Sequence, residues 1–118
     1  NMIKNKWGRI LLSSSIGTKF GGGKDTYYYS LTKHMNEFIP SIFKKKYANY
    51  ILYNVLRIGV TNTKIHKNIP KKDLNLRKKL IPTNRIAEPA EVAEKIFFMA
   101  SDKNTLIHSQ IINISGGE

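Results

Sequence analysis

The stretch Tyr50–Val60, which reads YILYNVLRIGV, decides the fold class of this 118-residue chain. β-branched, aromatic and other apolar side chains fill most of it, and a threonine-rich turn follows. A short apolar run bounded by turn residues is typical of a strand that is buried on both faces, as in a parallel sheet. We therefore expect residues 50–60 to form a buried strand.

Towards the amino terminus the same pattern recurs in Ile10-Leu11-Leu12, which lies between Gly8-Arg9 and Ser13-Ser14-Ser15 and predicts an earlier buried strand. A glycine-rich loop from Ile16 to Asp25 follows. Beyond it, apolar residues at spacings of three, four, seven and eight predict a helix, with a kink at the proline it contains. The residues concerned are Met35, Phe38, Ile39, Ile42 and Phe43, with Pro40 among them.

Towards the carboxyl terminus, residues 61–85 are polar and lysine-rich, and they predict a long loop with a short helix near Asp73–Leu80. Pro89 suits the first position of a further helix. A last strand is expected at Gln110–Ser115, before two glycines. The apolar face expected for the helix after Pro89 consists of Val92, Ala93, Ile96, Phe97 and Ala100.

The predicted order is strand, helix, strand, helix, strand, which indicates an α/β fold with a parallel sheet and right-handed crossovers. No apolar run is long enough to span a bilayer, and the first residues lack the apolar stretch of a secretory signal. We expect a cytoplasmic protein without a membrane partner. Because the chain begins at Asn1 and close to a strand, we also expect it to be a fragment.

The formal net charge is +12, which raises the possibility of a nucleic-acid partner. Against this, 16 of the 20 basic residues are lysine, and lysine, isoleucine and asparagine together make 43 of 118 residues, as an AT-rich coding sequence would produce. Arginine, the usual reader of bases, occurs four times. We expect no nucleic-acid partner, and a basic binding module remains an alternative. The absence of cysteine excludes disulfides and thiolate sites.

The segment Gly21-Gly22-Gly23-Lys24-Asp25 resembles a phosphate loop only superficially. The Walker pattern requires glycine where Thr18 stands and serine or threonine where Asp25 stands. We interpret the segment as a flexible loop. The three histidines, His34, His66 and His108, lack the spacing of metal ligands, so we expect surface or loop positions and no metal site.

Tyr29 and Lys33 stand four residues apart, which places both on one face of a helix. A cation beside a phenol favours the phenolate, so such a tyrosine can act as a general acid or base. The pair alone is a weak signal, because the chain is rich in both residue types. Ser15 ends one predicted strand, and Gly59–Thr63 follow the next. These residues and the Tyr29–Lys33 pair are therefore expected at one sheet edge, where ligands bind.

These motifs make the chain resemble the carboxyl-terminal half of a short-chain dehydrogenase/reductase. Five segments match in order and at the right spacing. They are Gly8-Arg9-Ile10 with Ser14-Ser15-Ile16-Gly17, Tyr29-Ser30-Leu31-Thr32-Lys33, Asn54–Thr63 (NVLRIGVTNT), Arg85–Ser101 (RIAEPAEVAEKIFFMAS) and Gln110–Gly117 (QIINISGG). The resemblance implies half of one Rossmann-type, doubly wound domain over residues 1–118, without the amino-terminal nucleotide-binding half.

The resemblance also implies an NAD(P)-dependent oxidoreductase that interconverts an alcohol and a carbonyl. Tyr29 would transfer the proton, Lys33 would stabilise the phenolate and bind the nicotinamide ribose, and Ser15 would hold the substrate oxygen. Gly59, Val60 and Thr63 would bind NAD or NADP. The residues from Lys64 to Leu80 would form a mobile lid, and the complete protein would be a homo-oligomer acting on a small molecule.

The chain departs from the family pattern at four places: Ile58 for proline, Ser109 for glycine, Pro40 within the catalytic helix, and Leu11-Leu12-Ser13 where asparagine is usual. None of these positions is Ser15, Tyr29 or Lys33. Pro40 and Ile58 support the further alternative of a non-catalytic remnant.

Overall fold

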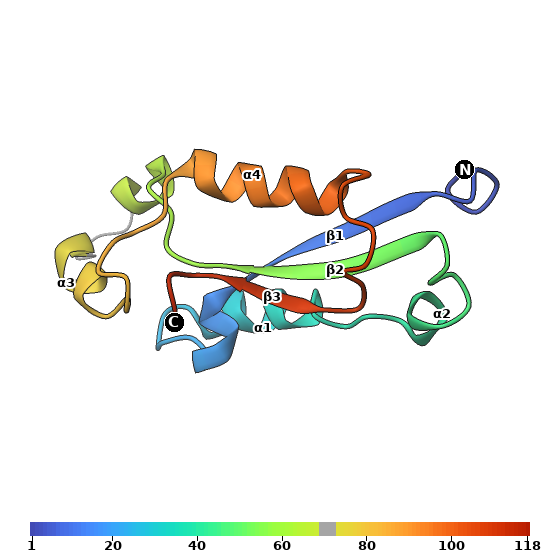
Figure 1. Ribbon diagram of the computed structural model, residues 1–118. Coiled ribbons are helices and arrows are strands. Elements are labelled where there is room, and N and C mark those ends of the chain that lie inside the picture. The colour runs from blue at the N-terminus through green and yellow to red at the C-terminus, as the bar shows by residue number, and fades with distance from the viewer. Residues whose placement is uncertain (69–72) are drawn as a thin grey trace.

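The computed structural model describes residues 1–68 and 73–118, and a three-stranded parallel sheet organises it (Figure 1). The strands lie in the order β1-β2-β3, so the stretch that decides the fold class forms the middle strand. Their bounds are Gly8–Ser15 for β1, Ile51–Ile58 for β2 and Ile111–Ile114 for β3. All three predicted strands are confirmed.

The carboxyl ends of the three strands meet in one row. Ser15 of β1 pairs with Ile58 of β2, and Ile58 pairs with Ile114 of β3. Segments that leave this row, including the glycine loop after β1 and the turn after β2, therefore begin side by side.

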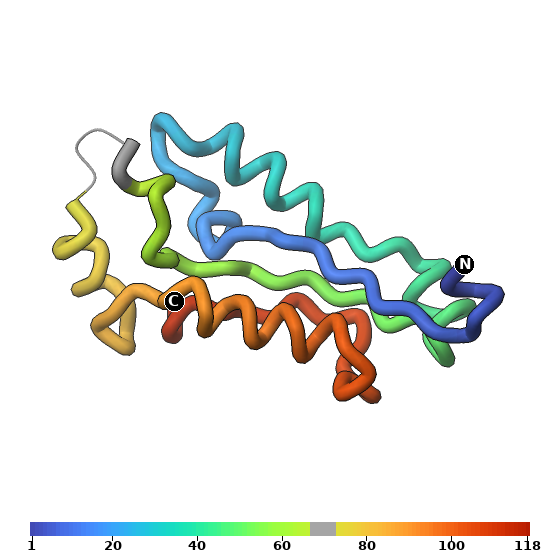
Figure 2. The backbone as a smooth tube through the Cα atoms, turned by 90° about the horizontal axis from the view of Figure 1, so that it is seen from above, coloured from blue at the N-terminus to red at the C-terminus, as the bar shows by residue number. Residues whose placement is uncertain are grey.

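Helices cover both faces of the sheet, as in a doubly wound Rossmann-like fold. One face carries α1 (Tyr27–Met35) and α2 (Ser41–Lys44), and the other carries α4 (Pro89–Ala100), as Figures 1 and 2 show. The predicted short helix is present as α3 (Leu74–Lys79). The described residues also contain two 3₁₀ helices that the sequence did not predict, η1 (Ile16–Phe20) and η2 (Lys64–Asn68).

The core lies on β2. Six consecutive residues of this strand, Ile51–Leu56, are buried, which confirms the expectation of a strand covered on both faces. On the α1 and α2 side, Tyr53 and Val55 pack against Ile39, and Ile10, Leu12 and Phe43 border this cluster. Burial of such side chains stabilises the fold by roughly 1.5–3 kcal/mol each.

The expected kink at Pro40 is wrong, because no continuous helix passes through this residue. α1 ends at Met35, and Pro40 stands as the N-cap of α2 with φ −60° and ψ 137°. Proline has no N–H to continue a helix and disfavours helical geometry in Ile39 before it. The result is a break of five residues, and this break places Glu37 in a turn against the sheet.

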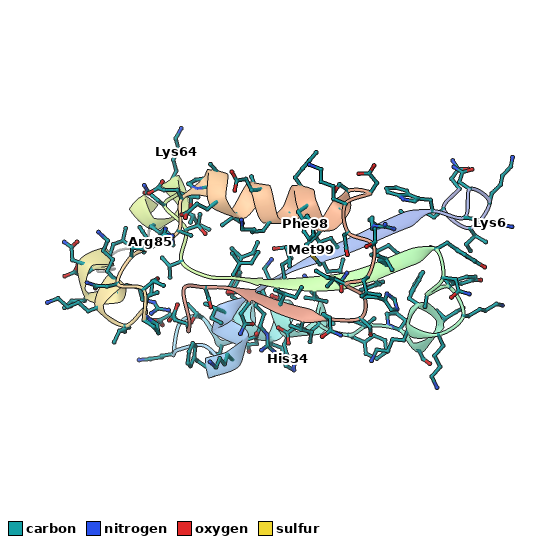
Figure 3. The ribbon with its side chains drawn as sticks, viewed as in Figure 1. Lys6, His34, Lys64, Arg85, Phe98 and Met99 are labelled. Atoms are coloured by element: carbon teal, nitrogen blue, oxygen red, sulfur yellow. The ribbon has the colours of Figure 1, made fainter. Side chains whose placement is uncertain are left out.

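The expected apolar face of α4 is also partly wrong. Val92 and Met99 are buried against the sheet, whereas Ile96 and Phe97 are exposed, Phe97 to 69% (Figure 3 labels Met99). Val92 and Met99 are seven residues apart, so they form one stripe that is rotated around the helix axis from the predicted one.

Candidate active site

A cavity of about 520 Å³ opens at the carboxyl ends of β1 and β2, and all six predicted site residues line it. These are Ser15, Tyr29, Lys33, Gly59, Val60 and Thr63. Ser13, Ser14, Thr26 and Thr61 also line it, as do Ile65 and His66 of η2 and Arg77 of α3. The sequence therefore predicted correctly that these residues lie together.

Ser15 is held at the point where β1 becomes η1. Its Oγ accepts a hydrogen bond from the backbone N–H of Gly17 at 3.2 Å, and its carbonyl accepts one from the Thr18 hydroxyl at 2.8 Å. The Ser15 hydroxyl thus caps the following turn while its proton remains available to a bound oxygen atom.

Tyr29 and Lys33 lie one turn apart on α1, as predicted. Lys33 Nζ is 5.9 Å from the centroid of the Tyr29 ring and donates a hydrogen bond to the carbonyl of Ser13 at 3.2 Å. This places a cation next to the phenol at the cavity wall. Ser15 and Tyr29 share the cavity but are not hydrogen-bonded to each other in the described part of the chain.

The two neighbouring tyrosines do not compete with Tyr29 for the cavity. The rings of Tyr27 and Tyr28 contact each other, with centroids 4.1 Å apart, and neither residue belongs to the cavity lining among the described residues. A hydrogen bond to Tyr28 raises the pKa of Tyr27 above its ordinary value. Register on α1 thus selects one tyrosine of the three.

Gly59, just after β2, lies so close to the end of β3 that no side chain fits at this position. Its N–H donates to the carbonyl of Ile114 at 2.8 Å, and a Cβ on Gly59 would lie 2.7 Å from Cα of Ser115. The chain then turns, with the Thr61 hydroxyl donating to the Gly59 carbonyl at 3.2 Å. This turn brings Val60 and Thr63 to the cavity.

Sequence reasoning missed a buried carboxylate beside this cavity, that of Glu37. Its Oε1 accepts hydrogen bonds from Ser14 Oγ at 2.7 Å, Thr18 Oγ1 at 2.8 Å and Arg57 Nε at 2.7 Å. Its Oε2 accepts one from the second guanidinium nitrogen of Arg57 at 2.6 Å, and His34 Nδ1 lies 3.3 Å away. The Glu37 side chain is 5% exposed.

The hydrogen bonds from Arg57 lower the pKa of Glu37 from 4.5 to about 2, and those from Ser14 and Thr18 act in the same direction. The Glu37 carboxylate in turn raises the pKa of Arg57. The signal that could have revealed this pair is Arg57 itself, the one charged residue in the stretch YILYNVLRIGV, because a charge in a buried strand needs a partner.

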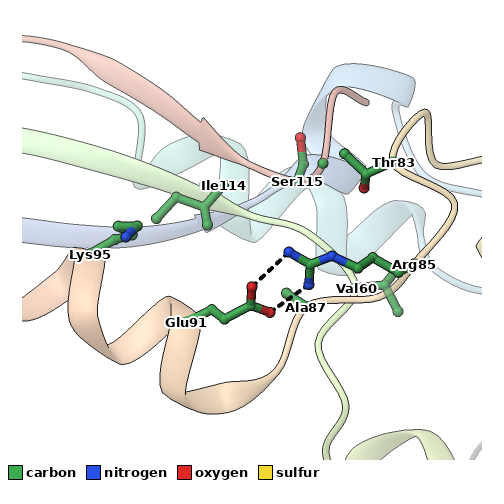
Figure 4. A pocket seen from close by; sticks show the side chains of 9 residues that line it. Val60, Thr83, Arg85, Ala87, Glu91, Lys95, Ile114 and Ser115 are labelled. Carbon is green, nitrogen blue, oxygen red and sulfur yellow. Dashed lines mark hydrogen bonds and ion pairs between the residues drawn. The ribbon is translucent and has the colours of Figure 1, made fainter.

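A second, smaller cavity of about 210 Å³ lies between α4 and the end of β3 (Figure 4). Arg85 and Glu91 both line it and are joined by two hydrogen bonds of 2.7 Å. These bonds lower the pKa of Glu91 to about 2. The two charges of this pair neutralise each other, and Lys95 adds a further cation to the lining. Of the predicted site residues, it contains Val60 alone.

The histidines lie at exposed or partly exposed positions or in a loop, as expected. His34 is on α1, His66 is in η2 at the larger cavity, and Nδ1 of His108 accepts a hydrogen bond from the Tyr53 N–H at 3.2 Å. Within residues 1–68 and 73–118, no group of three or more metal-binding side chains occurs, and no helix is long and apolar enough to cross a membrane. The absence of a metal and the cytoplasmic location remain predictions.

Comparison with known proteins finds relatives of similar sequence. The family model described as enoyl-(acyl carrier protein) reductase matches residues 1–118. The 3-oxoacyl-[acyl-carrier-protein] reductase FabG of Aquifex aeolicus (strain VF5) is 31% identical over 98% of the chain, and FabG of Thermotoga maritima is 29% identical over 98%. The chain spans 47% of the length of each of these relatives.

A solved structure of similar fold is the 3-oxoacyl-(acyl-carrier-protein) reductase of Agrobacterium tumefaciens C58, which has NADP bound. It is 22% identical, with a TM-score of 0.77 over 99% of this chain and 47% of that protein. The likeness shows the fold. The match of the family model over residues 1–118 establishes that the chain belongs to the short-chain dehydrogenase/reductase family of oxidoreductases.

Proposed function

We propose that the chain is the carboxyl-terminal catalytic half of an NAD(P)-dependent oxidoreductase that interconverts an alcohol and a carbonyl. The observation that carries the proposal is the single cavity that contains all six residues singled out by the sequence motifs. The chain spans about half of the relatives' length, which supports a longer complete protein, and we propose that its other half is amino-terminal and binds the nucleotide.

In this proposal Tyr29 donates the proton to the carbonyl oxygen, or accepts it from the alcohol in the reverse direction. The Lys33 ammonium stabilises the phenolate that results, since its Nζ lies 5.9 Å from the centroid of the Tyr29 ring. The Ser15 hydroxyl donates a hydrogen bond to the substrate oxygen and fixes it for proton transfer.

The side chains around the cavity suit a nicotinamide cofactor. Ribose hydroxyls, a carboxamide and phosphates need donors and acceptors, and the wall supplies the Lys33 ammonium, the Thr61 and Thr63 hydroxyls and the backbone at Gly59 and Val60. When bound, the cofactor supplies or accepts the hydride. The NADP in the Agrobacterium enzyme supports the same choice, and we propose NAD or NADP.

For the substrate we propose a small alcohol or carbonyl compound, and for the complete protein a homo-oligomer. The relatives named above are reductases of 3-oxoacyl groups on acyl carrier protein, which supports a 3-oxo group as the first substrate to test. β1 lies at the edge of the sheet, a position that suits pairing with a strand from an amino-terminal half.

A turnover measurement tests the proposal. Oxidation of NADH and NADPH is followed with a panel of small 3-oxo compounds, for residues 1–118 and for the same chain extended at its amino terminus. We expect turnover from the extended chain and little from residues 1–118. If the extended chain binds neither cofactor and turns over no compound of the panel, the proposal fails.

A basic nucleic-acid binding module is the less supported alternative, because the fold already uses all four arginines. Arg9 donates to the backbone at 2.6–3.2 Å, and the others pair with carboxylates. The pairs are Arg57–Glu37, Arg77–Glu118 and Arg85–Glu91. Lysines remain exposed, but they provide charge without base recognition. We propose that the protein has no nucleic-acid partner.

A further inference from the structure

The Glu37 carboxylate joins the elements that carry the proposed catalytic residues. Ser14 of β1 and Arg57 of β2 are paired residues in the sheet register, and both donate to Glu37. Ser15 follows Ser14 directly, and Gly59 follows Arg57 by two residues. Glu37 itself lies just after α1, the helix that carries Tyr29 and Lys33.

Two further contacts connect the junction formed by Glu37, Ser14 and Arg57 to Lys33. The Ser14 hydroxyl, which lies 2.7 Å from Glu37 Oε1, is also 3.1 Å from the carbonyl oxygen of Lys33. The Ser13 carbonyl accepts hydrogen bonds from Lys33 Nζ at 3.2 Å and from Asn36 Nδ2 at 3.1 Å. Ser13 and Ser14, the residues of β1 that precede Ser15, are therefore held against Lys33 in the last turn of α1 and against Asn36 just after it.

We propose that Glu37 and Arg57 form a positioning pair for proton transfer, which fixes the Lys33 ammonium and the end of β1 relative to Tyr29. This inference rests on the proposed function. The pair touches neither substrate nor cofactor; it acts through Ser13, Ser14 and Lys33. Glu37 keeps its charge at neutral pH, since Arg57, Ser14 and Thr18 all donate to it, so it transfers no proton itself.

The pair's effect on position can be separated from its effect on stability. Replacement of a buried ion pair by apolar side chains of similar size is often neutral for stability, whereas removal of one partner is strongly destabilising. The hydroxyls of Ser14 and Thr18 keep other acceptors, the carbonyls of Lys33 and Ser15. The double variant Glu37→Met/Arg57→Met is therefore expected to fold, but without the junction.

The kinetic test compares this double variant with Arg85→Met/Glu91→Met in the full protein that contains residues 1–118. Arg85 and Glu91 form an equally bidentate pair away from Tyr29 and Lys33. For the Glu37/Arg57 variant we expect kcat to fall about tenfold or more, since misplaced catalytic groups cost rate. We expect its KM to change less than about threefold and its melting temperature by no more than about 3 °C.

The control pair is expected to show the opposite pattern. Loss of the exposed ion pair and of the Glu91 contribution to the α4 cap should lower the melting temperature by about 2–6 °C and leave kcat within about twofold. An unchanged kcat in a folded Glu37/Arg57 variant overturns the inference. If that variant does not fold, Arg57→Lys takes its place: it keeps the charge, loses the second hydrogen bond, and must also lower kcat.

A chemical measurement that needs no turnover separates this inference from the proposed function. Amine acylation of Lys33 is measured by mass spectrometry relative to the exposed Lys24. Release of Lys33 from the Ser13 carbonyl in the Glu37/Arg57 variant should raise this ratio about threefold, and an unchanged ratio overturns the positioning. If Tyr29→Phe keeps full turnover, the proposed function fails, and the acylation ratio still decides on the positioning of Lys33.

Discussion

At the scale of single residues, what a sequence reveals depends on whether a residue's partners are near in the chain. Tyr29 and Lys33 could be paired from their spacing alone, because four residues make one helical turn. Glu37 could not be recognised, because its partners come from 23 residues before and 20 residues after it. Only the register of β1 against β2 brings those partners together.

The Glu37 carboxylate should contribute strongly to the loss of unfolding free energy at acid pH. Its pKa is about 2 in the folded chain and 4.5 ordinarily, so its contribution is complete above pH 4.5 and is lost as the pH falls through 2. We expect the free energy of unfolding to fall by about 1–3 kcal/mol over this range through Glu37. Urea unfolding of the chain and of Glu37→Gln between pH 2 and 6 measures it.

In Glu37→Gln the free energy of unfolding should be lower at pH 6 and should change less between pH 4.5 and 2. Some slope will remain, because the pKa of Glu91 is also lowered to about 2. Glu94→Gln is the matched control, since the Glu94 side chain is 75% exposed and lies 3.6 Å from a single lysine. Equal acid slopes in all three proteins would contradict this account of Glu37.

At the scale of elements, composition and periodicity located the strands and helices but not how they face each other. Each strand was predicted because short apolar runs between turn residues have few other structures available. The break before Pro40 and the rotation of α4 were missed for a different reason. Local pattern predicts a helix, whereas the sheet beneath it decides which side of α4 is buried, here that of Val92 and Met99.

The close contact between β2 and β3 predicts the effect of a methyl group on Gly59. A Cβ there would lie 2.7 Å from Cα of Ser115, a backbone atom that cannot move aside without opening the ends of both strands. We expect Gly59→Ala to destabilise the fold by about 1–3 kcal/mol, measured by denaturant unfolding. Gly23→Ala is the control, since its nearest contact would be 3.7 Å. Equal stability of the two variants would contradict the close packing.

At the scale of the whole molecule, apolar side chains remain exposed on α1, on α2 and in the break between them. The residues lie at successive spacings of three and four, and they are Tyr28, Leu31, Met35, Phe38 and Ile42. A surface of this kind marks an interaction site on a protein. The +12 charge, by contrast, is carried mainly by lysine, and among the lysines the proposed chemistry needs Lys33.

If this surface joins copies of the complete protein, a charge on it should separate them. We expect Phe38→Glu, at a side chain 73% exposed, to lower the mass measured by light scattering from that of an oligomer towards that of a monomer. Leu106→Glu is the control, because Leu106 is 87% exposed and lies in the connection between α4 and β3, outside the segment from α1 to α2. An unchanged mass for Phe38→Glu would show that the surface joins no copies.

In the proposed function Tyr29 transfers the proton, and its neighbour Tyr28 provides the comparison. Tyr28 and Tyr29 are adjacent on α1 and both exposed, but Tyr29 alone of the two lines the cavity with Lys33. The decisive measurement is kcat of Tyr29→Phe and Tyr28→Phe in the full protein, with NADH or NADPH. We expect kcat to fall about 100-fold or more for Tyr29→Phe and to change within about twofold for Tyr28→Phe. Near-normal turnover by Tyr29→Phe would contradict the proposed function.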